Sequence, residues 1–211
     1  MTETRNNKLT LIEYTEFQDA FDFFNSRLFD SALPEALVTL QRKSRSRGYY
    51  HAERFASRAD QENRVAEIAL NPDCFQDRTD TEILSTLVHE MCHLWRDGQR
   101  RIRNGYHDRE WGAKMKEIGL NPSSTGDSGG KETGYRVSHY ILPDGRFASE
   151  CAAFIDSGHR LNWQSQVGPK SKANKTRQKY QCGSCRLSAW AKPKAELLCG
   201  SCKGVIMLAV G

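Results

Sequence analysis

Residues 87–93 read LVHEMCH, and this stretch determines how the rest of the sequence is interpreted. It contains the pattern HExxH, formed by His89, Glu90 and His93. Residues four apart on an α-helix lie only about 40° apart around its axis, so both imidazoles can bind one metal ion. Glu90 lies next to that pair and can take a proton from water activated by the metal. The pattern therefore predicts a helical zinc site in which Glu90 is the general base.

The residues around this pattern favour a helix that is buried on one face. Apolar side chains recur at helical spacing on the side opposite the two histidines, namely Leu84, Leu87, Val88, Met91 and Trp95. We therefore expect that face to pack into a core while the histidines line a cleft. Thr79 and Glu82 form a capping box, which predicts a helix from about Thr79 to Gly98.

Two histidines do not complete a catalytic zinc site, which typically has three protein ligands and one open position. His107 is our candidate for the third ligand, because it lies just before a helix expected from Asp108 to Gly119. A side chain at that position can point back toward the first helix. The competing histidines are His51, His139 and His159.

Elements on either side complete an α+β pattern. A helix is expected over residues 15–29, opened by a capping box of Thr15 and Gln18. Short strands are expected at residues 36–40, 48–55 and 65–70. Residues 121–134 are rich in Ser, Gly and Asp and predict a linker. Segments 135–142 and 146–154 flank Pro143-Asp144-Gly145 and predict a β-hairpin.

The 211 residues suffice for one ordinary domain and a small appendage. No apolar run is long enough to cross a bilayer, and the N-terminus MTETRNNKLT has no apolar export signal. We therefore expect a cytoplasmic protein with no membrane partner. The net charge of +5 is moderate and only hints at an acidic partner such as nucleic acid.

Four of the seven cysteines form two CxxC pairs near the C-terminus: Cys182, Cys185, Cys199 and Cys202. In a reducing compartment such pairs indicate metal ligands rather than disulfides. Thirteen residues separate the pairs, a spacing slightly below that usual for zinc ribbons. We expect a structural zinc here, because four thiolates leave no position for water. The site would be separate from the catalytic zinc.

A basic segment precedes this module and suggests contact with DNA, including single strands. Its cations are Lys170, Lys172, Lys175, Arg177 and Lys179. Tyr180 and Trp190 are candidates for stacking on bases. Further candidates for the same surface lie beside the HExxH helix, namely Arg96, Arg100, Arg101 and Arg103; the alternative for these four is an exposed loop. The alternatives are a solvated tether for the basic segment and a folding staple or protein-docking module for the ribbon.

The stretch from Glu67 to Gly119 resembles the SprT-like metalloproteases, which include the Spartan proteases. The resemblance is carried by the strand EIALNP, the helix LVHEMCHLW, a gap of 13 residues, His107 with Trp111, and the closing KMKEIGL. It implies a small zincin-like core over residues 1–120, with three histidine ligands and a glutamate base. The family usually has glycine after the third ligand, whereas this chain has Asp108, a good N-cap residue.

Two functions fit these features. The first is a zinc-dependent endopeptidase that associates with DNA and cleaves proteins bound or crosslinked to it, as the resemblance implies; this would place the protein at the nucleoid. The alternative is a non-catalytic, zinc-containing nucleic-acid-binding or transcription-associated protein. Glu90 favours the first, because a structural site has no use for a general base.

The expected order is a metalloprotease core, a linker, a β-hairpin extension, a basic linker and a zinc ribbon, at residues 1–120, 121–134, 135–164, 165–179 and 180–211. We also expect substrate backbone to pair with the edge of the strand at residues 65–70, because this strand leads into the HExxH helix.

Overall fold

The computed structural model describes residues 8–100, 105–167 and 177–210. The chain forms two compact units, residues 1–169 and 170–211. The expected linker at 121–134 and the segment 135–164 therefore belong to the same unit as the first 120 residues. No helix in the described ranges is both long and apolar enough to cross a membrane.

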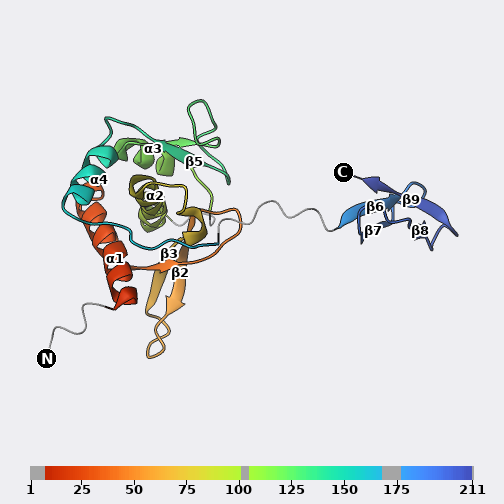
Figure 1. Ribbon diagram of the computed structural model, residues 1–211, viewed down its shortest axis with the longest axis horizontal. Helices are drawn as coiled ribbons and strands as arrows, with labels where there is room; N and C mark the ends of the chain where they lie inside the picture. The colour runs from red at the N-terminus through yellow and green to blue at the C-terminus, as the bar shows by residue number, and fades with distance from the viewer. Residues whose placement is uncertain (1–7, 101–104, 168–176, 211) are drawn as a thin grey trace. The chain divides into compact units, whose positions relative to one another are not determined.

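The first unit is built around helix α2 (Asp80–Gln99), which Figure 1 shows nearly end-on between the other elements. Helix α2 contacts α1 (Leu9–Leu28), α3 (Arg109–Ile118) and α4 (Arg146–Asp156), together with strands β2 (Gly48–Ala56) and β3 (Arg64–Leu70). Side chains from Ile83 to Leu94 are buried without a break. The apolar stripe predicted for this helix is therefore only part of its buried surface.

The predicted start of α2 is confirmed. The Thr79 hydroxyl accepts from the Glu82 amide, and the Glu82 carboxylate accepts from the Thr79 amide. Helix α3 follows the prediction equally closely: Asp108 caps its first turn, and Gly119 ends it in a left-handed conformation with φ of 96°. Side-chain caps and a positive-φ glycine depend on local sequence, so these boundaries could be predicted.

Helix α1 begins at Leu9, so the capping box expected at Thr15 and Gln18 is wrong. No Gly or Pro interrupts residues 8–28, and the helix continues through Thr15. The predicted apolar face is present, however: Phe17, Phe21 and Phe24 are buried in the core.

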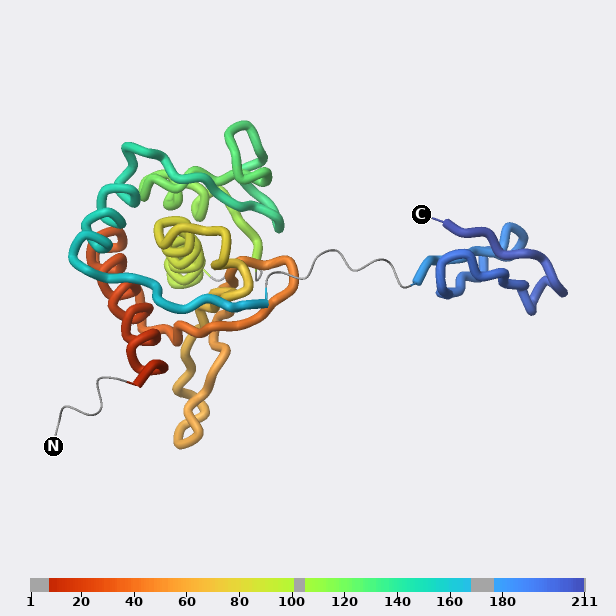
Figure 2. Tube along the Cα trace, viewed as in Figure 1, coloured from red at the N-terminus to blue at the C-terminus, as the bar shows by residue number. Residues whose placement is uncertain are grey.

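The main sheet has the strand order β1-β3-β2, in which β1 is Ala36–Leu40. Strand β3 pairs in parallel with β1 and in antiparallel with β2. The three strands were expected at these places, but β3 is central and buried, so it offers no edge to a substrate. Strand β2 is an edge strand instead, with a β-bulge between His51 and Phe55. Figure 2 shows the β2–β3 hairpin extending beyond the rest of the unit in this view.

The β-hairpin expected within residues 135–164 is wrong. Strand β5 (Ser138–Ile141) pairs with β4 (Leu120–Ser123), and residues 146–156 form α4. Phe147, Cys151 and Phe154 are the buried side chains of α4, and their spacing of four and three residues is helical rather than alternating. The segment after α4 returns across the unit (Figure 2). The Leu161 amide, in this segment, donates to Asp80.

Gly119 and Gly145 allow the backbone before β4 to pass close to the start of α4. A Cβ at Gly119 would lie 2.7 Å from the Gly145 Cα, and one at Gly145 would lie 2.8 Å from the Gly119 Cα. The Leu142 amide donates to the Gly119 carbonyl at 3.0 Å. This approach brings β5, and with it His139, against the α2 region.

The second unit is a four-stranded sheet with the order β7-β6-β9-β8. Its strands are β6 (Gln178–Cys182), β7 (Ser188–Ala191), β8 (Leu198–Cys199) and β9 (Val205–Val210). Its small core consists of Tyr180, Cys182, Cys199 and Met207. So small an apolar core requires another source of stability, which the cysteines described below can supply by binding metal.

Candidate metal centre and active-site cleft

Helix α2 places His89 and His93 one turn apart, with Glu90 beside them. All three side chains are buried. His107 reaches the same point from the segment before α3. Its Nε2 atom lies 3.2 Å from Nε2 of His93 and 3.3 Å from Nε2 of His89. Three ring nitrogens therefore converge on one position, as the sequence led us to expect.

The backbone holds His107 through a two-residue bridge. The amides and carbonyls of His107 and Gly134 exchange two hydrogen bonds of 3.0 Å. The ring Nδ1 also lies 2.8 Å from the Gly134 carbonyl, so Nδ1 carries the proton and donates it. The lone pair of Nε2 is left facing the other two histidines. Gly134, expected to end a linker, thus orients the third histidine.

An ion-pair cluster fixes the chain on both sides of His107. Arg96, near the end of α2, contacts Asp108 through Nε at 2.9 Å and Nη2 at 2.8 Å, and contacts Glu110 at 2.7 Å. Asp108 at the same time accepts from the Trp111 amide as the cap of α3. Arg96 is only 4% exposed, so its expected part in a DNA-binding surface is wrong. Arg101 and Arg103 lie outside the described residues.

His139 contacts the ring nitrogen of His89 that faces away from the cluster. The Nδ1 atoms of the two rings lie 3.0 Å apart, and Nε2 of His139 lies 2.9 Å from the Ser85 hydroxyl. With Nε2 of His89 facing the cluster, its Nδ1–H donates to His139, whose Nε2–H donates to Ser85. Ser85 in turn donates to the Glu82 carbonyl at 2.8 Å. His139, considered above as a competing ligand, is therefore a neighbour of the cluster and not a member of it.

Trp111 packs against all three rings of the cluster. Its ring centroid lies 4.9 Å from that of His89, 5.2 Å from that of His93 and 4.3 Å from that of His107. The side chain is fully buried. The sequence signal for this packing was the spacing of four residues between His107 and Trp111, which places Trp111 on the first turn of α3.

Burial changes the protonation of the whole cluster. Loss of solvent lowers the pKa of His93 to about 3, holds that of His89 well below its usual value, and also lowers that of His107. The same loss of solvent raises the pKa of Glu90 to about 8, against the opposing effects of the Lys43 charge and a backbone hydrogen bond from Tyr50. A bound cation would stabilise this cluster, because the three imidazoles are neutral and the Glu90 carboxyl group ionises with difficulty.

The donor set fits a zinc ion. Zinc–nitrogen bonds of about 2.0–2.1 Å in a tetrahedron place two ligand nitrogens roughly 3.4 Å apart. The observed separations of 3.2 and 3.3 Å agree with that value. Three nitrogen ligands also leave a fourth position open, as in catalytic zinc sites.

A cleft of about 1000 Å³ opens over this cluster. Its walls come from the β1–β2 loop at residues 41–47, from β2, and from residues 135–138. Tyr135 lines it, whereas Tyr106 packs edge-on against Tyr135 with ring centroids 5.1 Å apart. His51 lines the cleft on β2, and His159 pairs with Glu16 elsewhere.

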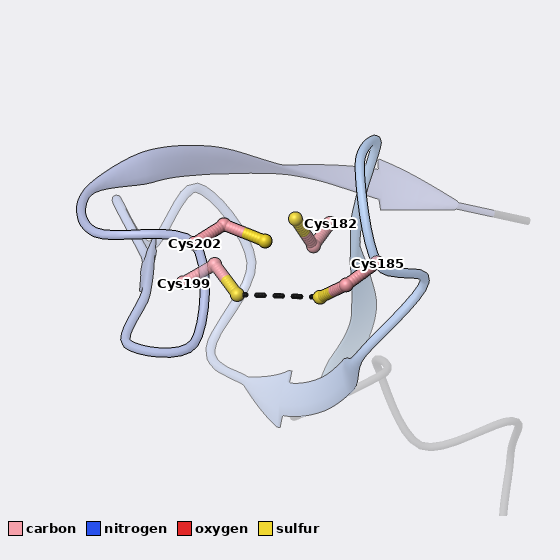
Figure 3. Close-up of side chains that lie close together, drawn as sticks. All are labelled: Cys182, Cys185, Cys199 and Cys202. Carbon is pink, nitrogen blue, oxygen red and sulfur yellow. Dashed lines mark hydrogen bonds between the residues drawn. The ribbon is translucent and has the colours of Figure 1, made fainter.

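The second unit holds a second candidate metal site. The sulfurs of Cys182, Cys185, Cys199 and Cys202 point toward a common centre, and those of Cys185 and Cys199 lie 3.6 Å apart (Figure 3). Zinc–sulfur bonds of about 2.3 Å give a similar separation of roughly 3.8 Å in a tetrahedron. Hydrogen bonds from the backbone amides of Cys185 and Ser184 lower the pKa of Cys182, whereas contact with the Cys185 thiol raises that of Cys202, so Cys182 is the thiol that ionises more readily before metal binds.

The residues expected to contact nucleic acid differ in their exposure to solvent. Lys170, Lys172 and Lys175 lie outside the described residues. Arg177 is exposed and Lys179 is half-buried. Trp190 is 64% exposed and free to stack, but Tyr180 is buried, donates to the Lys192 carbonyl and accepts from the Ala195 amide. The expectation that Tyr180 stacks on bases is therefore wrong.

The His139 contact predicts a measurable effect on metal affinity. His139→Ala removes the acceptor that orients His89, and outer-shell losses of this kind cost about 10–100-fold in affinity. Competition between a chelator and the protein for zinc, in a Cys199→Ser background, measures this effect. His159→Ala, which removes a histidine far from the cluster, is the matched control. Equal affinities in the two variants would mean that His139 does not orient the ligand.

Comparison with known proteins matches residues 17–129 to the SprT-like family. A protein of Salmonella typhimurium, described as "Uncharacterized protein in mucB 3'region", is 51% identical over 45 residues. The match covers 21% of this chain and 61% of that relative, so the chain spans less than two thirds of the relative's length. No solved structure matches the chain. The family match covers more than half of the chain and includes all three histidines of the cluster, and the protein therefore belongs to the SprT-like family.

Proposed function

We propose that this chain is a zinc-dependent endopeptidase whose zinc is held by His89, His93 and His107. The observation that carries the proposal is the convergence of three neutral Nε2 atoms in the cleft that also contains Glu90. Four thiolates in the second unit would hold a structural zinc. The same four cysteines would also suit a non-catalytic zinc protein, but that alternative gives no use to the Glu90 carboxyl group inside the cleft.

When bound, zinc would act as a Lewis acid that polarises a peptide carbonyl and makes water easier to deprotonate. The three histidines fix the position of that centre, and His139 and Gly134 fix the tautomers of His89 and His107. Glu90 accepts the proton of the attacking water and returns it to the nitrogen of the leaving amine. Because a nearby cation favours the carboxylate, the bound metal would offset the burial that raises the Glu90 pKa.

Strand β2 is the best candidate for binding the substrate backbone, in place of β3. One edge of β2 pairs with no strand in the described part of the chain, and residues 48–51 line the cleft. An extended peptide can add to such an edge through backbone hydrogen bonds. Gly48 lets β2 pack closely against α2 beside the cleft, since a Cβ there would lie 2.9 Å from Cγ2 of Thr86 and 3.4 Å from Oε1 of Glu90.

The basic segment and the second unit are proposed to bind DNA, so that the substrates are proteins bound or crosslinked to DNA. Exposed Arg177 and exposed Trp190 support this assignment. A tether of this kind raises the effective concentration of any protein fixed nearby and requires no allosteric change. It would also confine the peptidase to the nucleoid within the cytoplasm.

Glu90→Gln tests the chemistry of the site. The amide keeps the shape of the side chain but cannot accept the proton, so we expect the peptidase kcat to fall by at least about 10²-fold while zinc stays bound. Peptide hydrolysis and metal content measured on the same samples would show this. Glu117→Gln, on the exposed side of α3, is the matched control. Undiminished hydrolysis by Glu90→Gln would exclude the mechanism.

The two metal sites should empty independently. Wild-type protein is expected to bind two zinc ions per chain. Cys199→Ser should remove one and unfold the second unit, because structural zinc supplies folding free energy. His89→Ala should remove the other and leave the ribbon intact. Elemental analysis of the three proteins tests this, and one zinc per wild-type chain would mean that one assignment is wrong.

Neutralising the basic segment should separate DNA binding from peptide hydrolysis. We expect replacement of its cations, Lys170, Lys172, Lys175, Arg177 and Lys179, by glutamine to flatten the salt dependence of single-strand binding, by about 0.7 in log–log slope for each lost phosphate contact. Trp190→Ala should weaken that binding by about 1–3 kcal/mol if the ring stacks on a base.

Hydrolysis of a short free peptide should stay unchanged in both variants, while DNA-stimulated cleavage of DNA-bound protein should be lost. Trp163→Ala, which removes an exposed tryptophan of the first unit, is the control for Trp190→Ala. Equal cleavage of DNA-bound protein after both changes would assign the second unit to folding or protein docking instead.

A further inference from the structure

The walls of the cleft carry an excess of positive charge. Its cationic lining residues are Arg42, Lys43, Arg45, Arg47, Arg54 and Arg136. The acidic lining is Glu90 alone among the residues that the structure describes. These cations come from two parts of the chain: Arg136 from the segment before β5, and the others from the β1–β2 loop and β2.

Part of this charge is already neutralised within the protein. Arg42 pairs with Asp73 at 3.3 Å, and Arg54 pairs with Glu67 at 3.6 Å. Lys43 lies over the Tyr49 ring, 4.1 Å from its centroid. Because these three cations already interact with groups of the protein, they are less available to bind a ligand.

The remaining three cations face solvent without such partners. Arg45, Arg47 and Arg136 are exposed, and no carboxylate pairs with them within the described residues. Since all three line one cleft, their fields add in the space that it encloses. An anionic group entering that space gains from all three, whereas a cationic group is repelled.

The aromatic lining argues against a nucleic acid as the occupant. Single-strand binding combines cations with exposed aromatic rings on which bases stack. Tyr49 is covered by Lys43 and donates to Glu67, while Tyr50 stacks on His93 and donates to Asp97. Tyr135 is therefore the one tyrosine of the described lining that is left exposed, and a single ring is a poor platform for a strand.

We propose that the cleft selects polypeptide segments that carry acidic side chains on both sides of the scissile bond. This inference rests on the proposed peptidase function and adds the substrate class of the same site. A peptide extended along β2 projects side chains alternately to its two sides. Glutamate or aspartate side chains near the cut would then meet Arg45 and Arg47 of the β1–β2 loop and Arg136 of the segment before β5.

The test uses one unstructured peptide that the full-length zinc enzyme cleaves, with the cut located by mass spectrometry. The residues flanking the cut are replaced by Glu, by Gln or by Lys, and kcat/KM is measured for each peptide. Exposed ion pairs each contribute up to about fivefold. We expect the Glu peptide to exceed the Gln peptide by about tenfold at low salt and the Lys peptide to be the poorest. The preference should shrink as salt rises.

A charge-matched pair of triple variants assigns the preference to the cleft. Arg45→Gln, Arg47→Gln and Arg136→Gln together should reduce the Glu-to-Gln ratio to near one. Arg58→Gln, Arg109→Gln and Lys131→Gln together make the same change in net charge at exposed positions outside the cleft lining. This control should keep the ratio of the unmodified enzyme, because the preference comes from charges inside the cleft. Long-range attraction that depends on net charge alone would instead lower the ratio equally in both triple variants.

The experiment distinguishes failure of the acidic preference from failure of the proposed peptidase function. Cleavage of the Gln peptide that depends on Glu90, with no gain for the Glu peptide, would overturn the acidic preference and leave the peptidase intact. No cleavage of any peptide would overturn both. A single-stranded oligonucleotide that binds the enzyme, loses affinity in the cleft triple variant and blocks the Glu and Gln peptides equally would assign the cleft to nucleic acid instead.

Discussion

Helix α2 buries two imidazoles and a carboxyl group at a point where a third imidazole meets them, and a bound cation would stabilise that arrangement. Desolvation keeps the histidines neutral and opposes ionisation of Glu90. Nε2 of His107 lies 3.2 Å from Nε2 of His93 and 3.3 Å from Nε2 of His89. No single hydrogen bond among them can satisfy all three nitrogen lone pairs. The contacts of His89 with His139 and of His107 with Gly134 hold the cluster in this arrangement, which suits a bound metal ion.

The elements that impose this geometry come from distant parts of the chain. Gly134 orients His107, the Arg96–Asp108 ion pair fixes the entry to α3, and His139 on β5 orients His89. Strand β5 reaches α2 because two glycines, Gly119 and Gly145, let the backbone cross closely. Residues 120–156 therefore complete the metal centre and do not merely extend a finished core. Truncation near residue 120 would remove the partners of two of the three histidines.

Local signals explain what the sequence could predict. The capping box of α2, the Asp108 cap and the HExxH spacing depend on residues within one or two turns of each other. The predictions that were wrong have a different cause. The helical period of Phe147, Cys151 and Phe154 is short and follows a turn, so it resembled a second hairpin strand. The central place of β3, the burial of Tyr180 and the contact of His139 with His89 depend on which segments meet in space, and no local pattern encodes that.

The proposed mechanism requires that three imidazoles share one zinc ion, and the zinc X-ray absorption spectrum of full-length Cys199→Ser protein tests this most directly. That substitution should leave only the histidine site occupied. We expect nitrogen and oxygen neighbours at about 2.0–2.1 Å, with outer-shell scattering from three imidazole rings. Sulfur at about 2.3 Å, or scattering from fewer than three imidazoles, would contradict it.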